Sequence, residues 1–331
     1  MKRTVVLFFI LITVTFILFV TDILVGSVDI PLEIFLSDEG IYSSIICDIR
    51  IPKAITSILT GSALAVSGLL MQTLFRNPLA GPSILGISSG ATLGVAVYVL
   101  FLSMCGISFS AFSIYGTLFC AMLGAFLMLV LILLVSMSVR DSITLLIVGV
   151  ITGSLTTSIV AVLQNISDPE SVKHFVNWTL GNLESVSWNQ LQLFAPIVFV
   201  VILLLLGCIK SLDAYLLGES YAQGVCISVK RYRLVIIFFT AILTGVTTAF
   251  TGPIGFVGII VPHVARMLFN TSKHSKIYPA SILIGMITML LCDILSQLPD
   301  NGYVLPINAV TALIGAPIVL WILLGRNKMV V

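Results

Sequence analysis

Apolar runs of about 20 residues dominate this sequence and constrain its fold more than any other feature. A helix needs roughly 20 apolar residues to cross about 30 Å of hydrocarbon. The sequence therefore predicts an all-α polytopic membrane protein with about ten transmembrane helices. Their expected positions are 4–25, 54–75, 84–104, 112–138, 143–164, 191–209, 234–251, 254–269, 278–297 and 305–325.

The composition and patterning exclude several other classes of protein. Only 9% of the residues are charged and 59% are hydrophobic, whereas soluble domains carry about 25% charged residues. A net charge of +2 from so few groups does not suit a nucleic-acid-binding surface. A transmembrane β-barrel would alternate in polarity, but the stretch from Leu123 to Val135 is apolar on every face.

The first apolar run follows Met1-Lys2-Arg3 and so resembles the start of a secretory signal. It is longer than a typical signal core, and no small-x-small cleavage site follows it. We therefore expect it to remain as a transmembrane helix.

Basic residues are distributed unevenly over the segments between the expected helices. With ten crossings and Lys2 and Arg3 inside, 13 of the 16 Lys and Arg residues fall on the inner side. Arg50, Lys53 and Lys173 fall outside, together with 11 of the 14 acidic residues. Because basic residues concentrate on the cytoplasmic side of membrane proteins, we expect both termini in the cytoplasm.

Cysteine and histidine indicate no metal or disulfide site. The six cysteines are scattered without a CxxC pair, and most lie in or beside apolar runs, where Cys acts as a small apolar residue. His263 could ligate haem or a metal ion, but no second ligand is visible nearby. A structural or interface histidine is the favoured interpretation, and no cofactor is expected in this chain.

Proline and glycine interrupt the expected helices in two places. Pro78 and Pro82 follow Asn77 after the second run, and Gly252-Pro253 separates the seventh run from the eighth. Broken backbone within a membrane protein lines a cavity or is buried in protein, which suggests a gate. Leu-Thr-Gly recurs in both halves, at 59–61 and 243–245. Since those two helices would run in opposite directions, we expect an inverted repeat of helices 2–5 and 7–10.

Small residues gather on one face of the second expected helix. Gly61, Ala65 and Gly68, together with Ser62, lie three or four residues apart. This spacing lets another helix approach closely where lipid provides no hydrophobic drive. Helix packing is the simplest interpretation of these residues.

The longest charged segment on the inner side runs from Lys210 to Arg233. Its patterning around Gly218 and Gly224 predicts two short helices outside the bilayer. An apolar stripe follows the same stretch, formed by Leu216, Leu217, Tyr221 and Val225. A solvated loop would not need this stripe, so we expect a protein partner on the cytoplasmic side.

Several motifs, in order and at matching spacing along nearly the whole chain, resemble those of the FecCD family. They are Arg-x-Pro-Lys (50–53), Gly-x-Ala-Leu-Ala-x-Ser-Gly (61–68), Gln-x-x-x-Arg-Asn-Pro-Leu-Ala-x-Pro (72–82), Leu-Gly-Ile-Ser-x-Gly-Ala (85–91), Gly-x-Ile-Gly-Phe-Val-Gly-Ile-Ile-x-Pro-His-x-x-Arg (252–266) and Leu-Pro-Ile-Asn-Ala-Val-Thr-Ala-Leu-Ile-Gly-Ala-Pro (305–317). Members of this family are permease subunits of binding-protein-dependent ABC importers for iron-siderophores, haem and cobalamin.

The resemblance implies one permease domain over residues 1–331 in the cytoplasmic (inner) membrane of a bacterium, surrounded by lipid. It implies a second permease subunit, expected to be a copy of this chain although a similar chain would fit, around a central path. It also implies two cytoplasmic ATPase subunits and an extracytoplasmic substrate-binding protein. No nucleic-acid partner is expected.

The resemblance also implies roles for particular residues. Asn77, Leu79 and Ser142 match or lie near the cytoplasmic gate of cobalamin permeases. The segment 211–229 matches the helices that couple to the ATPases, with Leu217, Gly218, Glu219, Ala222 and Gly224 as its expected contacts. Arg50 and Lys53 match an outer basic pair that docks the binding protein. Family members often carry a further docking Arg where this chain has Gln297, so that contact is lost here or moves to another group such as Lys173.

The expected mechanism is a conduit driven by its partners. The chain has no Gly-x-x-x-x-Gly-Lys-Ser/Thr loop, so ATP hydrolysis is assigned to the separate subunits. An ion-coupled secondary transporter is the alternative, but few ionisable residues fall within the spans. An intramembrane enzyme would require paired catalytic groups that three scattered histidines do not provide. A siderophore is favoured over haem, and haem over cobalamin, only because iron uptake is the commonest role in the family.

Overall fold

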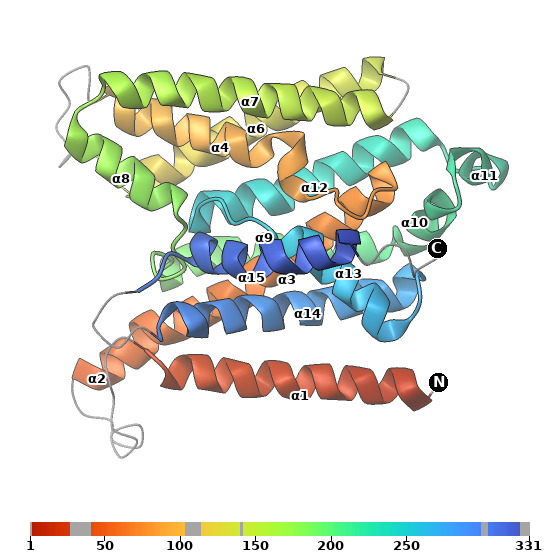
Figure 1. Ribbon diagram of the computed structural model, residues 1–331, viewed down its shortest axis with the longest axis horizontal. Helices are drawn as coiled ribbons and strands as arrows, with labels where there is room; N and C mark the ends of the chain where they lie inside the picture. Colours follow the sequence, from red (N-terminus) through yellow and green to blue (C-terminus); the bar gives the residue numbers. More distant parts are fainter. Residues whose placement is uncertain (1, 27–40, 103–113, 140–141, 299–303, 325–331) are drawn as a thin grey trace.

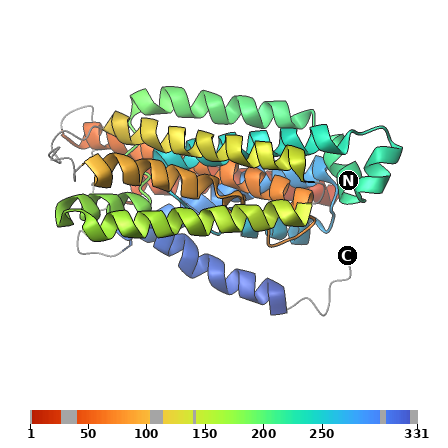
Figure 2. The same ribbon diagram turned by 90° about the horizontal axis from the view of Figure 1, so that it is seen from above.

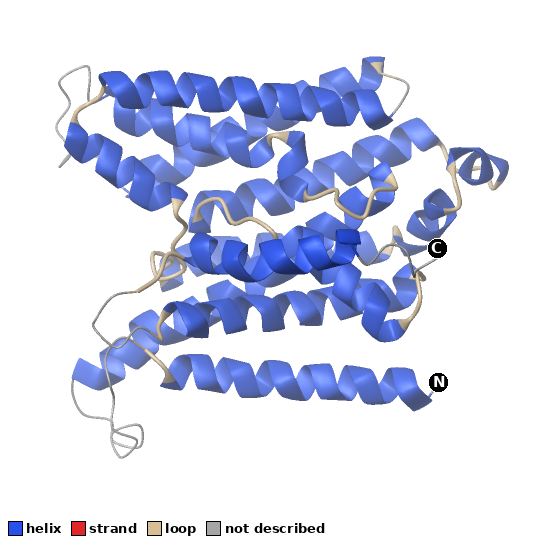
Figure 3. Ribbon diagram, in the orientation of Figure 1, coloured by secondary structure: helices blue, strands red, loops and turns tan. Residues whose placement is uncertain are grey.

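The computed structural model describes residues 2–26, 41–102, 114–139, 142–298 and 304–324, and the regular structure in these ranges is helical throughout (Figures 1 and 3). Seven helices are long and apolar enough to cross a membrane: α1 (Lys2–Leu24), α3 (Ile51–Phe75) with the helical turns before it, α6 (Ile114–Ser138), α7 (Ser142–Ile166), α9 (Trp188–Leu206), α12 (Val229–Thr251) and α14 (His274–Ser296). Three shorter apolar helices are α4 (Ile87–Ala96) with η4 (Val97–Phe101), α13 (Val257–Phe269) and α15 (Ile307–Leu324).

These ten helices lie on the ten predicted runs, and the all-helical polytopic fold is confirmed. Ten crossings, as an exact number, stay a prediction. The helices run roughly along one long axis (Figure 2). α1 begins and α15 ends at the same end of the bundle (Figure 1), as an even number of crossings requires. Which side of the membrane this end faces stays a prediction, as does the inverted repeat.

α3 lies at the centre of the bundle. Its sides contact α12, α13 and α14, and α14 in turn contacts α1 at the edge. Glycines make the closest approaches, because a Cβ at Gly61 would overlap the Gly285 carbonyl and one at Gly68 would overlap the Gly258 carbonyl. The predicted packing role of these small residues is confirmed.

Both predicted helix breaks are present. α3 ends at Phe75, Arg76 adopts a left-handed conformation, and the chain turns through the short 3₁₀ helix η3 (Pro82–Leu85) before α4. α12 ends at Thr251, and Gly252 takes φ 75°, which favours a residue without a side chain. α13 begins at Val257, three residues later than predicted, because the chain from 252 to 256 remains extended or turned.

Two stretches of helix differ from the sequence-based expectation. The helix containing α3 starts well before the predicted residue 54, because α2 (Ile41–Ser44) and the π-helical η2 (Ile45–Arg50) continue directly into it. α8 (Pro169–Thr179) was not predicted; Pro169 occupies its first turn and the Asp168 carboxylate accepts the Ser171 N–H at 2.9 Å. Two short helices, α10 (Ile209–Leu216) and α11 (Glu219–Gly224), occupy the segment where two were predicted.

We call the end of the bundle that carries α10 and α11 the α10 end, and the opposite end the Lys53 end (Figure 1). The Asn77 turn lies at the α10 end. The Gly252 turn, α8 and the C-terminal ends of α1 and α14 lie at the Lys53 end. The two helix breaks therefore face opposite ends of the bundle.

Replacing Gly68 with Ala is expected to lower the free energy of unfolding by about 3 kcal/mol, because the added methyl meets backbone that cannot rotate away. Thermal unfolding in detergent measures the change. Gly224→Ala is the matched control, since a Cβ there has nothing within 4 Å. Equal melting temperatures for the two variants would show that α3 and α13 do not pack this closely.

Candidate functional sites at the two ends of the bundle

The turn after α3 is organised by Asn77. Its side-chain Oδ1 accepts the Leu79 N–H at 3.0 Å, and its carbonyl accepts the Ala80 N–H at 3.0 Å. The Asn77 N–H donates to the Gln72 carbonyl at 3.1 Å, so the turn is joined to the last turn of α3. This is the local closure that Asn and the following proline favour. Leu79 is left half-buried at the α10 end.

The other predicted gate residue, Ser142, is the first residue of α7. Its side chain lies outside the described residues. Further along α7, a Cβ at Gly149 would overlap the Ile84 carbonyl, so this helix contacts η3 just after the Asn77 turn. The gate role of Asn77, Leu79 and Ser142 stays a prediction.

A polar contact joins α3 to α13 beneath this turn. Gln72 donates from Nε2 to the Ile259 carbonyl at 2.9 Å, and its Oε1 accepts from Arg266 Nη1 at 2.6 Å. His263 lies on the same helix as Arg266 and is half-buried. Among the described residues no three His, Cys, Asp or Glu side chains come together as a metal site.

The two short helices present an apolar surface away from the bundle. Leu217 is 67% exposed, Tyr221 52% and Val225 48%. Gly218 joins α10 to α11 with φ 119°, a backbone conformation that residues other than glycine rarely adopt. The predicted stripe is therefore exposed, and Leu216, which the sequence placed in it, is half-buried.

The remaining residues predicted as coupling contacts divide between surface and interior. Gly224 is exposed, whereas Ala222 is fully buried and packs inward. Glu219 accepts the Tyr215 hydroxyl at 2.7 Å and pairs with Arg233 Nη2 at 3.6 Å. Arg233 also donates to the Val139 carbonyl at 3.1 Å. Glu219 thus attaches α11 to α10 and to the start of α12.

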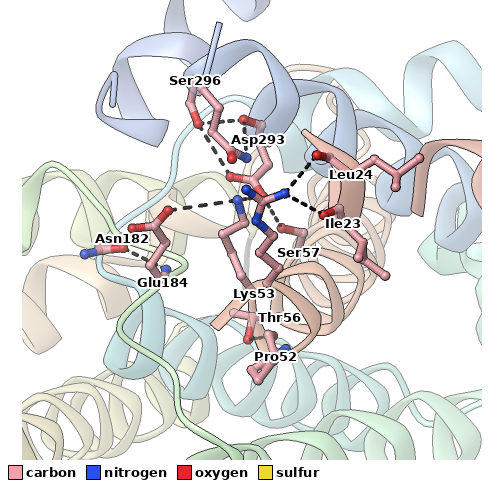
Figure 4. Close-up of polar contacts among 12 residues, drawn as sticks. Ile23, Leu24, Pro52, Lys53, Thr56, Ser57, Asn182, Glu184, Asp293 and Ser296 are labelled. Atoms are coloured by element: carbon pink, nitrogen blue, oxygen red, sulfur yellow. Dashed lines mark hydrogen bonds and ion pairs between the residues drawn. The ribbon is translucent and has the colours of Figure 1, made fainter. Parts of the chain in front are cut away.

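At the Lys53 end, the two predicted docking cations are buried, and Figure 4 shows Lys53 directed toward Asp293 and Glu184. Arg50 is 4% exposed and donates from Nη1 to the carbonyls of Ile23 and Leu24 at 3.0 and 2.8 Å. Lys53 is 2% exposed; its Nζ lies 3.4 Å from Asp293 Oδ2 and 3.9 Å from Glu184 Oε1. The docking role of these two buried side chains stays a prediction.

Two buried carboxylates accompany these cations. Asp22 is fully buried near the end of α1, and Asp293, 4% exposed, lies near the end of α14. Asp22 interacts electrostatically with Asp293, Lys53 and Arg50. Ser57 donates to Asp293 Oδ2 at 3.5 Å (Figure 4). Two neighbouring carboxylates can both remain buried only if nearby cations neutralise them or if they share a proton.

Gln297 is also directed inward. It is 7% exposed and donates from Nε2 to the Asp293 carbonyl at 3.3 Å, whereas Lys173 on α8 is exposed. Asp22 and Asp293 were not predicted as functional residues. The available signal was that each acid falls within an apolar run, where ionisable residues are rare and paired.

A cavity of about 290 Å³ with a mostly apolar lining lies between α6, α8, α9 and the Gly252 turn. Burial lowers the pKa of His174, which lines the cavity, and so favours its neutral form. Amide side chains provide the other prominent polar groups, from Asn177, Asn182 and Gln190.

Comparison with known proteins defines the class. The FecCD transport family matches residues 10–325. The vitamin B12 import system permease BtuC of Vibrio cholerae is 33% identical (89% of this chain and 88% of the relative), and the hemin transport system permease HmuU of Yersinia pestis is 32% identical (85% and 83%). The molybdate import system permease MolB of Haemophilus influenzae is 31% identical (85% and 81%). A solved structure described as an inward-facing conformation of a metal-chelate type ABC transporter superposes with a TM-score of 0.81 at 31% identity, covering 96% of this chain and 99% of that one.

The chain belongs to the FecCD transport family. It is an ABC importer permease and a multi-pass protein of the cytoplasmic membrane. Permeases of this family are transport subunits whose ATPase is a separate subunit, and ABC importer permeases work as dimers with ATPase and substrate-binding partners. Relatives that import haem, cobalamin and molybdate all match, so membership in the family leaves the substrate open.

Replacing Lys53 with Met is expected to lower the free energy of unfolding by about 3–5 kcal/mol, because it leaves Asp293 buried without its cation. The double variant Lys53→Met/Asp293→Leu should recover most of that loss, since it removes both charges. Lys173→Met, on the exposed lysine of α8, should change stability by less than about 0.5 kcal/mol. Chemical unfolding in detergent measures all three, and additive losses in the double variant would disprove the pairing.

Proposed function

We propose that this chain forms the transmembrane path of an ATP-driven importer for a metal chelate or related cofactor: an iron-siderophore, haem or cobalamin. The ligand is delivered by a substrate-binding protein, and two copies of the chain enclose the path. Two cytoplasmic ATPase subunits supply the energy, and the chain itself carries no cofactor. The exposed apolar surface on α10 and α11 is the observation that carries this proposal, because it offers a place where an ATPase can bind and move the transmembrane helices.

The chemistry of that surface supports an ATPase as its partner. Leu217, Tyr221 and Val225 are large apolar side chains on helices too short and too polar to lie in lipid. Aromatic and aliphatic anchors of this kind dominate the energy of protein interfaces. Because Glu219 and Arg233 attach the short helices to α12, a displacement of this surface would reach the transmembrane helices.

The gate follows from the break after α3. The Asn77 turn is held by its own hydrogen bonds and ends a helix that is buried along most of its length. A rigid helix next to a turn can change its tilt while the turn absorbs the dihedral change. We assign Asn77 and Leu79 to the cytoplasmic constriction, with Ser142 of α7 beside them.

Docking of the binding protein would involve the Lys53 end. Acidic side chains of the binding protein would compete with Asp293 and Glu184 for Lys53, which would loosen the contact between α3 and α14. Charge pairing of this kind affects orientation and association rate more than affinity. It would also weaken as salt concentration rises.

Uptake into proteoliposomes tests the substrate and the energy source. The purified complex would be offered a ferric hydroxamate siderophore, haemin, cobalamin and molybdate, each with its own binding protein. We expect uptake of one metal chelate, lost when the phosphate-loop lysine of the ATPase is replaced and unaffected by an uncoupler at constant ATP. Uptake that collapses with the uncoupler would favour an ion-coupled transporter, and uptake of molybdate alone would refute the chelate assignment.

Leu217→Asp is expected to weaken ATPase binding by about 30-fold or more, the loss typical of a central apolar anchor. Co-purification and binding-protein-stimulated ATP hydrolysis measure the loss. Leu298→Asp makes the same change at a leucine that is 60% exposed at the Lys53 end, and ATPase binding should remain native. Equal binding by both variants would remove α10 and α11 from the interface.

A further inference from the structure

His274, the first residue of α14, connects α10 to α3. Its ring is 1% exposed, and the Asp213 carboxylate on α10 contacts it twice. Asp213 Oδ1 accepts the His274 backbone N–H at 2.7 Å and lies 2.7 Å from ring Nδ1. A side chain of α10 therefore caps the start of α14 and holds its first side chain.

The opposite side of the ring contacts α3. His274 Nε2 lies 2.9 Å from Thr73 Oγ1, and Thr73 is fully buried. The Thr73 hydroxyl also lies 2.8 Å from the Leu69 carbonyl, one turn back along α3. One imidazole thus connects three helices that are far apart in the sequence.

Both contacts persist whichever protonation state the ring adopts. In the neutral ring, Nδ1–H donates to Asp213 and Nε2 accepts the Thr73 hydroxyl proton. In the imidazolium, both nitrogens donate, and the Thr73 hydroxyl donates its proton to the Leu69 carbonyl instead. The connection therefore depends on the three side chains and their positions rather than on a particular charge.

Thr73 occupies the part of α3 that forms the Asn77 turn. Its carbonyl accepts the Arg76 N–H at 3.3 Å, and the neighbouring Gln72 carbonyl accepts the Asn77 N–H. Gln72 is also bonded to Ile259 and Arg266 of α13. A displacement of Thr73 would therefore also displace the Asn77 turn, which we assign to the gate.

We propose that His274 is a positioning residue that transmits movement of α10 to the gate end of α3, an inference that rests on the proposed function. The contacts of the ring with Asp213 and Thr73, at 2.7 and 2.9 Å, lie within the ordinary range of protein hydrogen bonds, about 2.7–3.2 Å. When the ATPases displace α10, Asp213 moves with it and pulls on His274, the first residue of α14. The His274 ring, through its Nε2, then moves Thr73 in the last turns of α3. Asp213, at 39% exposure, lies close enough to the surface for a docked partner to affect it.

The test uses the complete complex in proteoliposomes, with its ATPase and binding protein and the compound that the native complex takes up from the four probes above. Thr73→Val keeps the shape of the side chain and removes the hydroxyl that meets Nε2. We expect ATP hydrolysis within about twofold of native and uptake per ATP lowered at least tenfold. Thr73→Ser, which retains the hydroxyl, should restore the native ratio.

Two further variants separate transmission from folding. Thr60→Val removes a buried hydroxyl from the same helix, one without a hydrogen-bond partner among the described residues, and the uptake-to-ATP ratio should stay native. Asp213→Ala removes both contacts to His274 from a partly exposed position and should reproduce the lowered ratio. Combined with Thr73→Val it should cause no greater loss than the stronger single variant, as expected for residues of one chain of contacts.

Several outcomes would overturn the inference. A native ratio in Thr73→Val would do so, as would a failure of Thr73→Ser to restore it. Uptake and hydrolysis that fall together, in proportion to the amount of assembled complex, would show a purely structural role. If the native complex itself neither hydrolyses ATP nor transports any probe, the proposed function is refuted and the inference with it.

Discussion

Direct contact between helix backbones holds this bundle together. Lipid is as apolar as leucine, so helices in a membrane gain little by burying apolar surface and associate through close packing. Gly61 against Gly285 and Gly68 against Gly258 bring α14 and α13 onto α3. The same arrangement joins α4 to α6, where Gly90 lies against Gly124. These contacts leave no room for side chains, so the backbones of α13 and α14 lie directly against that of α3.

Burial of α3 determines what happens at both of its ends. A helix without access to solvent is stabilised when the polar groups it carries find internal partners. At one end Lys53 meets Asp293, and at the other Gln72 and Thr73 meet side chains of α13 and α14. α3 therefore connects the charge cluster at the Lys53 end to the Asn77 turn at the α10 end. A change in the tilt of α3 would move both the charge cluster and the Asn77 turn, as alternating access requires.

Local sequence signals predicted much of this arrangement. Apolar runs predicted ten helices, proline and glycine predicted the breaks at Asn77 and Gly252, and the pattern around Gly218 predicted two short helices. α8 was missed because its 11 residues are mostly polar and carry no apolar run. Asp168-Pro169 at its start was the available signal, since Asp caps helices and Pro favours their first turn.

The candidate sites were less predictable than the helices, because their partners are distant in sequence. Arg50 and Lys53 stood out as rare outer cations, but their burial depends on Asp22, Asp293 and the carbonyls of Ile23 and Leu24. Likewise His274 gives no signal of a link between α10 and α3 until Asp213 and Thr73 are placed beside it. The sequence by itself determined which segments suit lipid and where they break, because these properties depend on residue type and local spacing. Only the tertiary structure decided which polar groups pair, because pairing depends on how helices that are remote in the chain pack against one another.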